Sequence, residues 1–339
     1  MNTEKPVLID IKNLQTHFFM NQGLIRAVDG VNLSIYRGET LGVVGESGCG
    51  KSITARSILR LIQPPGKIVG GQILLHQNTG MNNEEVVDLV ALDAGGQKIR
   101  RIRGGEVAMV FQEPMTSLSP VHTVGDQITE AIRLHRNVSP TEAKKMAIDM
   151  LGRVRMVQPD RVFDQYPFSL SGGMRQRVCI AMALVCHPSL LIADEPTTAL
   201  DVTTEAQILN VMRKLQKELG MAIMFITHNL GVIAQMADRV AVMYLGQVVE
   251  VADVKTLFGE PQHPYTQALM RSIPRLGKKT GQPLESIKGT VPDPFTQLKG
   301  CRFHTRCSQM IPGVCNVTPP PVVQTAPGHE VRCILYGEK

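Results

Sequence analysis

The 339-residue sequence contains no tryptophan, and only 4% of its residues are aromatic. So few aromatic side chains argue against a surface that binds single-stranded nucleic acid by base stacking. Long apolar runs are also missing. The longest, residues 178–193, is interrupted by His187-Pro188-Ser189, so no membrane-spanning helix is expected. Residues 1–14 carry charges and no apolar stretch, so they are not expected to form a signal peptide.

The chain also lacks a strong charge of either sign, since its net charge is +6 and charged residues make up 19%. With 43% hydrophobic residues it has enough apolar material for a core, and its length predicts about two domains. Residues 259–339 hold eleven of the 21 prolines, and ten Lys and Arg against five Asp and Glu. This shift predicts a domain over 1–258 and a C-terminal extension over 259–339. The positive charge indicates a solvated tail or, alternatively, contact with an anionic surface.

Short apolar, β-rich runs alternate with helical patterns, which predicts an α/β fold with a mostly parallel sheet. The predicted strands are Val7–Ile11, Thr40–Val44, Val107–Val110, Leu190–Ala193, Ala222–Thr227 and Arg239–Tyr244. The predicted helices outside the insert are Lys51–Leu61, Thr203–Leu219 and Leu230–Met236. Residues from about 115 to 187 are mostly helical in pattern and predict a helical subdomain. The polar segment Gln77–Gly96 is predicted to be a surface loop.

A phosphate-binding motif, G-x-x-x-x-G-K-S/T, lies between a predicted strand and a predicted helix, the context that it requires. Its residues are Gly45, Glu46, Ser47, Gly48, Cys49, Gly50, Lys51 and Ser52. Glycines let the backbone wrap a phosphate, and consecutive N–H groups with a helix N-terminus attract the anion. Lys51 is expected to reach the β- and γ-phosphates of a nucleotide, and the Ser52 hydroxyl is expected to bind Mg²⁺.

Two further segments complete a nucleotide site. Asp194 and Glu195 follow an apolar strand, which brings two carboxylates to the edge of the sheet where ligands bind. Asp194 is expected to hold Mg²⁺, and Glu195 to orient or deprotonate the attacking water. Ser171-Gly172-Gly173 lies 23 residues before Asp194 and begins a predicted helix, so its N–H groups can receive an anion.

Residues 7 to about 258 resemble the nucleotide-binding subunit of ABC transporters, with Met174 where that family most often has Gln. The resemblance implies that Gln112 contacts Mg²⁺, that His228 lies near the γ-phosphate, and that Asp201 belongs to the loop after the carboxylates. It implies that Phe18, or its neighbour Phe19, stacks on adenine. It also implies that the Ser171–Gly173 segment closes on ATP held by a second ATPase subunit, identical or a sibling.

The C-terminal extension has four of the seven cysteines, and a chain expected to be cytosolic should keep them reduced. They are Cys301, Cys307, Cys315 and Cys333, with 5, 7 and 17 residues between them and no C-x-x-C pair. Metal binding is therefore a better prediction than disulfides, with His304 and His329 as alternative ligands. Cys49, Cys179 and Cys186 are predicted to bind no metal.

The extension resembles that of the oligopeptide/dipeptide/nickel branch of ABC importers. The matching segments are His263–Leu269, Gly289–Pro292 and Gly300–Cys307, although Lys299 stands where that branch usually has Pro. The resemblance implies a 4Fe–4S cluster on the four cysteines, with zinc as the alternative. Four thiolates suit either metal group.

The resemblance implies an ATPase subunit that powers import of peptides or similar small solutes from the cytoplasmic face of the membrane. It implies two transmembrane permease subunits, an extracytoplasmic solute-binding protein acting indirectly, and no nucleic-acid partner. The transported solute, whether peptide, nickel or oligosaccharide, stays open. Soluble ABC ATPases of DNA repair, chromosome organisation or iron–sulfur assembly are the alternatives, but the importer-like segments favour the first interpretation.

Overall fold

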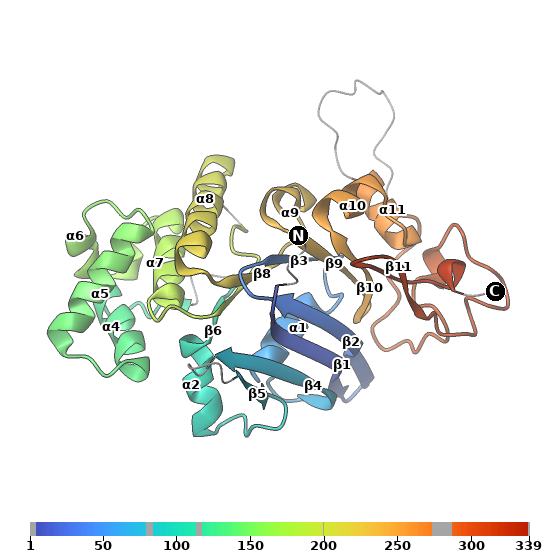
Figure 1. Ribbon diagram of the computed structural model, residues 1–339, viewed down its shortest axis with the longest axis horizontal. Helices are drawn as coiled ribbons and strands as arrows, with labels where there is room; N and C mark the ends of the chain where they lie inside the picture. Colours follow the sequence, from blue (N-terminus) through green and yellow to red (C-terminus); the bar gives the residue numbers. More distant parts are fainter. Residues whose placement is uncertain (1–4, 79–83, 113–116, 199, 273–286, 338–339) are drawn as a thin grey trace.

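The computed structural model describes residues 5–78, 84–112, 117–198, 200–272 and 287–337. An eight-stranded sheet runs through the centre of the molecule (Figure 1) with the order β11-β12-β10-β9-β3-β8-β7-β6. Its parallel strands are β3 (Thr40–Val44), β6 (Val107–Val110), β7 (Leu190–Asp194), β8 (Ala222–Ile226) and β9 (Arg239–Tyr244). Its antiparallel strands are β10 (Gln247–Asp253), β11 (Val322–Ala326) and β12 (His329–Arg332). The predicted α/β fold with a mostly parallel sheet is confirmed.

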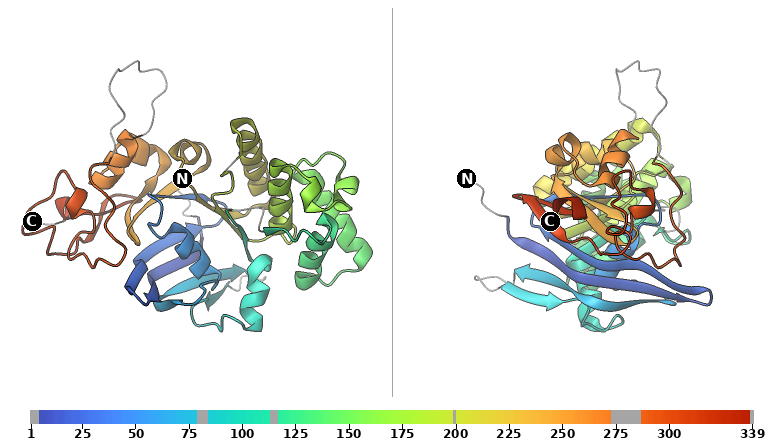
Figure 2. Two further views of the ribbon diagram at one scale, coloured as in Figure 1. Left: turned by 180° about the vertical axis from the view of Figure 1, so that it is seen from behind. Right: turned by 90° about the vertical axis from the view of Figure 1, so that its right-hand side faces the viewer.

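A second sheet of four antiparallel strands forms a separate layer beneath the first (Figure 2). Its order is β2-β1-β4-β5, with bounds β1 (Val7–Met20), β2 (Gly23–Tyr36), β4 (Gly66–Asn78) and β5 (Glu84–Asp88). The prediction of a surface loop over Gln77–Gly96 was therefore wrong, because the segment contains β5. This strand lies at the edge of its sheet, and its sequence gives a weak strand signal because three of its five residues, Glu84, Glu85 and Asp88, are acidic.

The central strands carry apolar residues on both faces, and the two faces belong to different cores. Leu190 and Ile192 of β7 pack into the core shared with the antiparallel sheet, whereas Leu191 and Ala193 pack into the core on the other side. Continuous apolar runs are typical of strands buried in this way. Helix α1 (Lys51–Ile58) contacts β1, β2 and β7, so it lies between the two sheets.

Helices gather at one end of the molecule, on the left in Figure 1. They are α4 (Val124–His135), α5 (Pro140–Arg153), α6 (Pro159–Phe163), the 3₁₀ turn η1 (Pro167–Ser169) and α7 (Gly172–Leu184). Local sequence explains where two of them begin. Thr123 with Asp126, and Ser139 with Glu142, form reciprocal capping boxes at the starts of α4 and α5.

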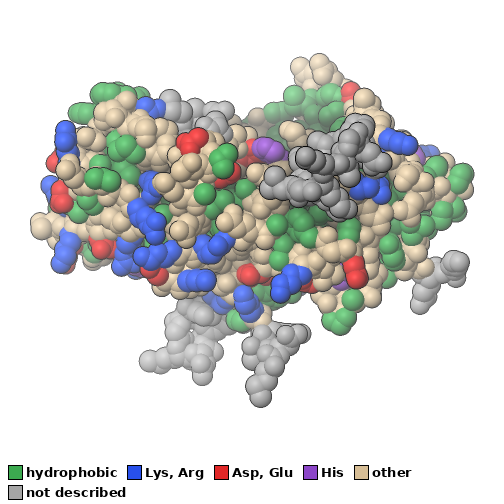
Figure 3. Space-filling view, turned by 90° about the horizontal axis from the view of Figure 1, so that it is seen from above, with side chains coloured by type: hydrophobic (Ala, Val, Ile, Leu, Met, Phe, Trp, Pro, Cys, Tyr) green, Lys and Arg blue, Asp and Glu red, His purple; other side chains and the backbone are tan. Residues whose placement is uncertain are grey.

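The remaining helices connect or flank the strands. They are α2 (Gln97–Gly105), α8 (Val202–Leu219), α9 (Leu230–Met236), α10 (Val254–Gly259), α11 (Pro264–Arg271), η2 (His304–Arg306) and η3 (Ile334–Tyr336). None of the helices in the described ranges combines the length and apolar character that crossing a bilayer would require. On the face viewed in Figure 3, Lys and Arg side chains are mixed with acidic and apolar ones.

Candidate functional site

The phosphate-binding motif forms the loop between β3 and α1. Gly45 and Gly50 have φ angles of +152° and +105°, in the region that favours glycine. A Cβ atom on Gly45 would lie 2.2 Å from the Met243 carbonyl oxygen, and one on Gly50 would lie 2.3 Å from the Ala27 carbonyl oxygen. Only glycine therefore allows the loop to follow this path between β2 and β9.

Lys51 begins α1 and is buried, with its side chain turned back into the loop. Its Nζ atom donates to the carbonyl oxygens of Gly45, at 2.8 Å, and Glu46, at 3.0 Å. The loop thus holds a cation at its centre, where it can meet phosphate oxygens. The neighbouring Cys49 is buried, and burial raises the pKa of its thiol, so Cys49 carries no reactive thiolate.

Ser52 and Asp194 bring two oxygen ligands together at the end of β7. The Ser52 Oγ atom donates to Asp194 Oδ1 at 2.9 Å. Burial raises the pKa of the Asp194 carboxyl, and the hydrogen bond from Ser52 opposes this rise. A buried carboxylate beside a hydroxyl is a donor set that suits Mg²⁺. The residues present therefore fit the expected ion.

Glu195 is the point where three side chains from separate segments meet. Its carboxylate accepts hydrogen bonds from Gln112 Nε2 at 3.1 Å and Thr198 Oγ1 at 3.0 Å, and lies 3.3 Å from His228 Nδ1. The Glu195 backbone is held at a φ of +46°, and its N–H donates to the Ile226 carbonyl oxygen at 2.9 Å. Such backbone strain is typical of active sites.

Three residues that the sequence assigned to catalysis, Gln112, Glu195 and His228, therefore lie together. Gln112 contacts Glu195 rather than the Ser52–Asp194 pair. Sequence reasoning missed Thr198, although its position three residues after Glu195 could have indicated the contact. Glu113 and Pro114, which follow Gln112, lie outside the described residues.

The Ser171–Gly173 segment and Asp201 line a second pocket, of about 410 Å³. Ser171 caps α7 by accepting the Met174 N–H at 3.3 Å, and Asp201 caps α8. Hydrogen bonds from Thr204 lower the pKa of the Asp201 carboxyl, so it is ionised at neutral pH. No residue of the 45–52 loop lines this pocket. Within the described residues of a single chain, this pocket and the phosphate-binding loop are therefore separate surfaces.

Ser47 and Gly48 line a cavity of about 630 Å³ beside the phosphate loop. Its other walls include residues 24–27 of β2, residues 245–246 after β9, and residues between 291 and 302 of the C-terminal extension. Neither Phe18 nor Phe19 lines it. Phe18 lines a different pocket near the end of α1, and Phe19 is 52% exposed. The adenine-stacking role of Phe18 stays a prediction, and sequence reasoning missed the wall that the extension supplies.

Cys301, Cys307, Cys315 and Cys333 line one small cavity, together with residues that include His304. Burial raises the pKa of the Cys301 thiol to about 11 and also raises those of Cys307 and Cys333. Within the described ranges, no three or more His, Cys, Asp or Glu residues are arranged to hold a metal ion. The fold thus gathers the four cysteines without presenting the ligand geometry of a single ion.

The two histidines suggested as alternative ligands have different surroundings. His304 lines the cysteine cavity, and its Nδ1 atom lies 2.7 Å from the Cys301 carbonyl oxygen. His329 instead contacts Glu250, with 2.8 Å between Nε2 and Oε1, and does not line the cavity. Of the two, only His304 therefore lies beside the cysteines.

A phosphate loop, a hydroxyl–carboxylate pair and a carboxylate held by glutamine and histidine together define a P-loop ATPase. Residues 28–198 match the family model described as ABC transporter, and residues 249–315 match the oligopeptide/dipeptide transporter C-terminal region. The chain therefore belongs to the ABC transporter family, as an ATP-binding subunit that hydrolyses ATP.

Curated relatives match nearly the whole chain. A probable peptide ABC transporter ATP-binding protein of Sinorhizobium fredii is 49% identical over 98% of this chain and 96% of its own length. The oligopeptide transport ATP-binding protein AppD of Bacillus subtilis is 47% identical over 98% of both chains. These matches confirm the resemblance identified from the sequence.

Solved structures match the cassette part of the fold. A post-hydrolysis dimer of an ATP-binding cassette bound to ADP and phosphate has a TM-score of 0.63 and 28% identity. It covers 73% of this chain and 99% of its own. A cassette from Clostridium perfringens has a TM-score of 0.60 and 27% identity, over 76% of this chain and 92% of its own. Part of this chain is therefore additional to the shared cassette.

Proposed function

We propose that this chain is the ATPase subunit of an importer of peptides or similar small solutes. In this proposal residues 1–258 are the nucleotide-binding domain and 259–339 are the C-terminal extension. The subunit binds two transmembrane permease subunits at the cytoplasmic face of the membrane, and an extracytoplasmic solute-binding protein delivers the solute. The observation that carries the proposal is the match of residues 249–315 to the oligopeptide/dipeptide transporter C-terminal region. Relatives that are named for peptide transport support it, because they match this chain over nearly their full length.

In the proposed site, residues 45–52 bind the phosphates of ATP, and Lys51 contacts the β- and γ-phosphates. Ser52 and Asp194 hold Mg²⁺. The ion, when bound, neutralises charge that develops on the phosphate oxygens. The 2.9 Å contact between Ser52 and Asp194 supports this assignment, because it brings both ligands to one point.

Glu195 is the proposed group that orients the attacking water and accepts its proton. Gln112 and Thr198 donate to the Glu195 carboxylate, and these hydrogen bonds hold it in one orientation. His228, which lies beside the other carboxylate oxygen of Glu195, is the proposed contact to the γ-phosphate. Gln112 and His228 come from segments distant from Glu195 in the sequence, so each can report movement of its own segment to the carboxylate.

We assign the Ser171–Gly173 helix start and Asp201 to the ATP held by a second ATPase subunit. The separation of their pocket from the phosphate loop supports this assignment. Two ATP molecules between two subunits favour the closed dimer, and their hydrolysis removes that bias. The resulting closing and opening is the output that drives the permease.

We assign a 4Fe–4S cluster to Cys301, Cys307, Cys315 and Cys333, with zinc as the alternative. Their convergence on one cavity supports a shared metal group. With Zn–S bonds of about 2.3 Å, one zinc ion would draw its four sulfurs to roughly 3.8 Å from one another. Among the described residues no group of ligands is arranged at the spacing of one bound ion, so the choice between cluster and zinc rests on the metal content of the purified protein. Because no electron enters ATP hydrolysis, the role of the cluster is structural.

The experiment is to purify the chain with its native membrane partners and measure ATP-driven uptake of a labelled peptide into vesicles. We expect Lys51→Ala to assemble with the permease but to lose ATP binding and uptake, because the phosphates lose their cation. Assembly is the internal control for folding. Unchanged ATP affinity in Lys51→Ala would contradict the site. Copurification with soluble DNA-processing partners in place of permeases would contradict the transport function.

A further inference from the structure

We propose that Arg306, in the C-terminal extension, is a positioning residue for the phosphate-binding loop. It acts through Glu46, the second residue of that loop. This role goes beyond the proposed function, which gives the extension only a metal group. The Arg306 guanidinium donates to the Glu46 carboxylate, the Tyr244 hydroxyl and the Lys288 carbonyl oxygen, so its effect on nucleotide binding is indirect.

The contact between Arg306 and Glu46 is a two-pronged ion pair. Arg306 Nη1 lies 2.7 Å from Glu46 Oε2, and Arg306 Nη2 lies 3.0 Å from Glu46 Oε1. The Arg306 side chain is 4% exposed and that of Glu46 is 25% exposed, so water screens the pair weakly. The hydrogen bonds with Glu46 raise the pKa of the Arg306 guanidinium. Paired, charge-assisted hydrogen bonds of this kind fix orientation as well as distance.

The backbone of Glu46 is fixed from the same side. Its N–H donates to the Tyr265 hydroxyl at 2.9 Å, and Tyr265 belongs to α11. The rings of Tyr265, Tyr244 and Phe303 pack against one another with centroids 4.7 to 5.4 Å apart. Phe303 lies three residues before Arg306, so one aromatic cluster supports both contacts to Glu46.

Glu46 connects these contacts to the phosphate-binding lysine. Its carbonyl oxygen accepts a hydrogen bond from Lys51 Nζ at 3.0 Å. Any movement of Glu46 therefore changes the position of the Lys51 ammonium and of the adjacent loop N–H groups. Loops hold anions tightly only when these groups are already oriented before binding. The extension supplies that orientation from 260 residues along the chain.

The test measures the affinity of the purified full-length chain for MgADP by calorimetry, since ADP reaches the loop without hydrolysis. We expect Arg306→Gln to weaken binding by about tenfold or more, as expected for the loss of a charge-assisted pair. Arg306→Lys should recover part of the affinity, because it keeps the charge but not the paired geometry. In ATPase assays the KM for ATP should rise more than kcat falls.

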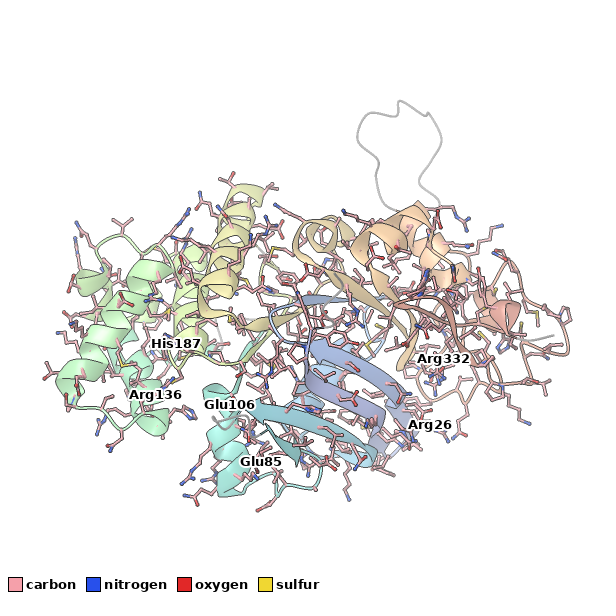
Figure 4. All side chains as sticks on the ribbon, in the orientation of Figure 1. Arg26, Glu85, Glu106, Arg136, His187 and Arg332 are labelled. Carbon is pink, nitrogen blue, oxygen red and sulfur yellow. The ribbon has the colours of Figure 1, made fainter. Side chains whose placement is uncertain are left out.

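Arg332→Gln is the matched control. Arg332 (labelled in Figure 4) precedes Cys333 as Arg306 precedes Cys307, but its Nε atom donates to the Val248 carbonyl oxygen at 3.2 Å. We expect it to bind MgADP like the unmodified chain. Glu46→Gln removes the pair from the loop side without changing the extension, so it keeps the test valid if Arg306→Gln does not fold.

The double variant Glu46→Gln, Arg306→Gln should bind no more weakly than Arg306→Gln, because Glu46→Gln removes only the ion pair that Arg306→Gln already removes. Unchanged affinity in a folded Arg306→Gln or Glu46→Gln chain would overturn the proposal. An equal loss in Arg332→Gln would also overturn it, since the effect would then be general loosening of the extension. Failure of the unmodified chain to bind MgADP would instead contradict the ATP site itself.

Discussion

Glu195 follows a buried strand directly, yet its carboxylate is within reach of side chains from three other positions in the chain. Its left-handed backbone turns the side chain away from the strand direction. This conformation costs free energy for a residue other than glycine, on the order of 1–3 kcal/mol. The surrounding hydrogen bonds offset that cost and leave the carboxylate in one position.

We expect Glu195→Gln to bind MgATP normally and to lower turnover by about 10²–10⁴-fold, because an amide cannot accept the proton of the attacking water. The variant should accumulate as a closed dimer with ATP, measurable by size-exclusion chromatography with and without nucleotide. Thr198→Ala is the companion variant, since it removes one support of Glu195 and keeps the carboxylate. Normal ATPase rates in Glu195→Gln would show that another group handles the proton.

We expect Asp194→Asn to stabilise the nucleotide-free protein while reducing Mg²⁺-dependent turnover by about 100-fold or more. Burial raises the pKa of Asp194 in the folded state, so the unfolded chain loses this proton first as the pH rises. As the pH rises above the ordinary pKa of an aspartate carboxyl, ionisation of Asp194 therefore lowers the free energy of unfolding. The variant has no carboxyl group and avoids that loss. Thermal unfolding at pH 4 and pH 7 should show the gain at pH 7 only. A less stable variant at pH 7 would contradict this account.

The residues of the site could be predicted where the chemistry lies in a continuous segment. The 45–52 loop and the Asp194–Glu195 pair are of this kind, because spacing along the chain already fixes their geometry. The contact of Arg306 with Glu46 could not be predicted, since no periodicity relates two residues so far apart. Such pairs are formed by tertiary packing, which a single sequence does not display.

At the scale of elements, buried parallel strands were predictable because their apolar runs are continuous, as in β7 and β8. The strands of the antiparallel sheet were harder to predict. Register irregularities interrupt the pairing of β1 with β2 and β4, and they disturb the two-residue alternation that would mark a long strand. Only the first part of β1 was therefore predicted, and β5 was not.

The start of α7 makes a prediction at this scale. We expect Ser171→Arg to leave nucleotide binding by the isolated subunit intact and to abolish hydrolysis, because a long cationic side chain would block the pocket that Ser171 lines. A mixed dimer of one variant and one unmodified subunit should lose hydrolysis of one of its two ATP molecules. Labelling the phosphate loop of each subunit separately identifies the subunit whose ATP is no longer hydrolysed. Loss at the mutant's own loop would contradict the assignment to a partner's ATP.

Across the whole molecule, the extension is tied to the cassette at several points. Glu250 of β10 is buried and accepts hydrogen bonds from the N–H groups of Gln262 and His263, at 2.8 and 2.9 Å. Strand β12 pairs with β10, so the extension continues the central sheet. The cysteine cavity lies in this added part, and its lining comes from the start of α11 and from residues between 301 and 335.

We expect Cys307→Ser to remove a brown colour from anaerobically purified protein and to reduce bound iron from about four atoms per chain, the content of a four-cysteine cluster. Residues 287–337 should then become more sensitive to protease, because a bound metal group stabilises a segment with little core of its own. Cys186→Ser, in a buried cysteine outside the cavity, should keep both colour and iron. A colourless chain that contains one zinc ion would contradict the cluster and support zinc. An extension that stays ordered without metal would refute both the cluster and the zinc assignment.

The pairing of Glu250 with Val331 also has a consequence for biosynthesis. When the ribosome has just released β10, the strand that will cover its open side has not yet been translated. An uncovered edge strand is a template for pairing with another chain. A nascent chain that is stalled or cleaved between residues 253 and 329 therefore exposes an unpaired edge of β10. We expect chaperones to bind such fragments and proteases to degrade them.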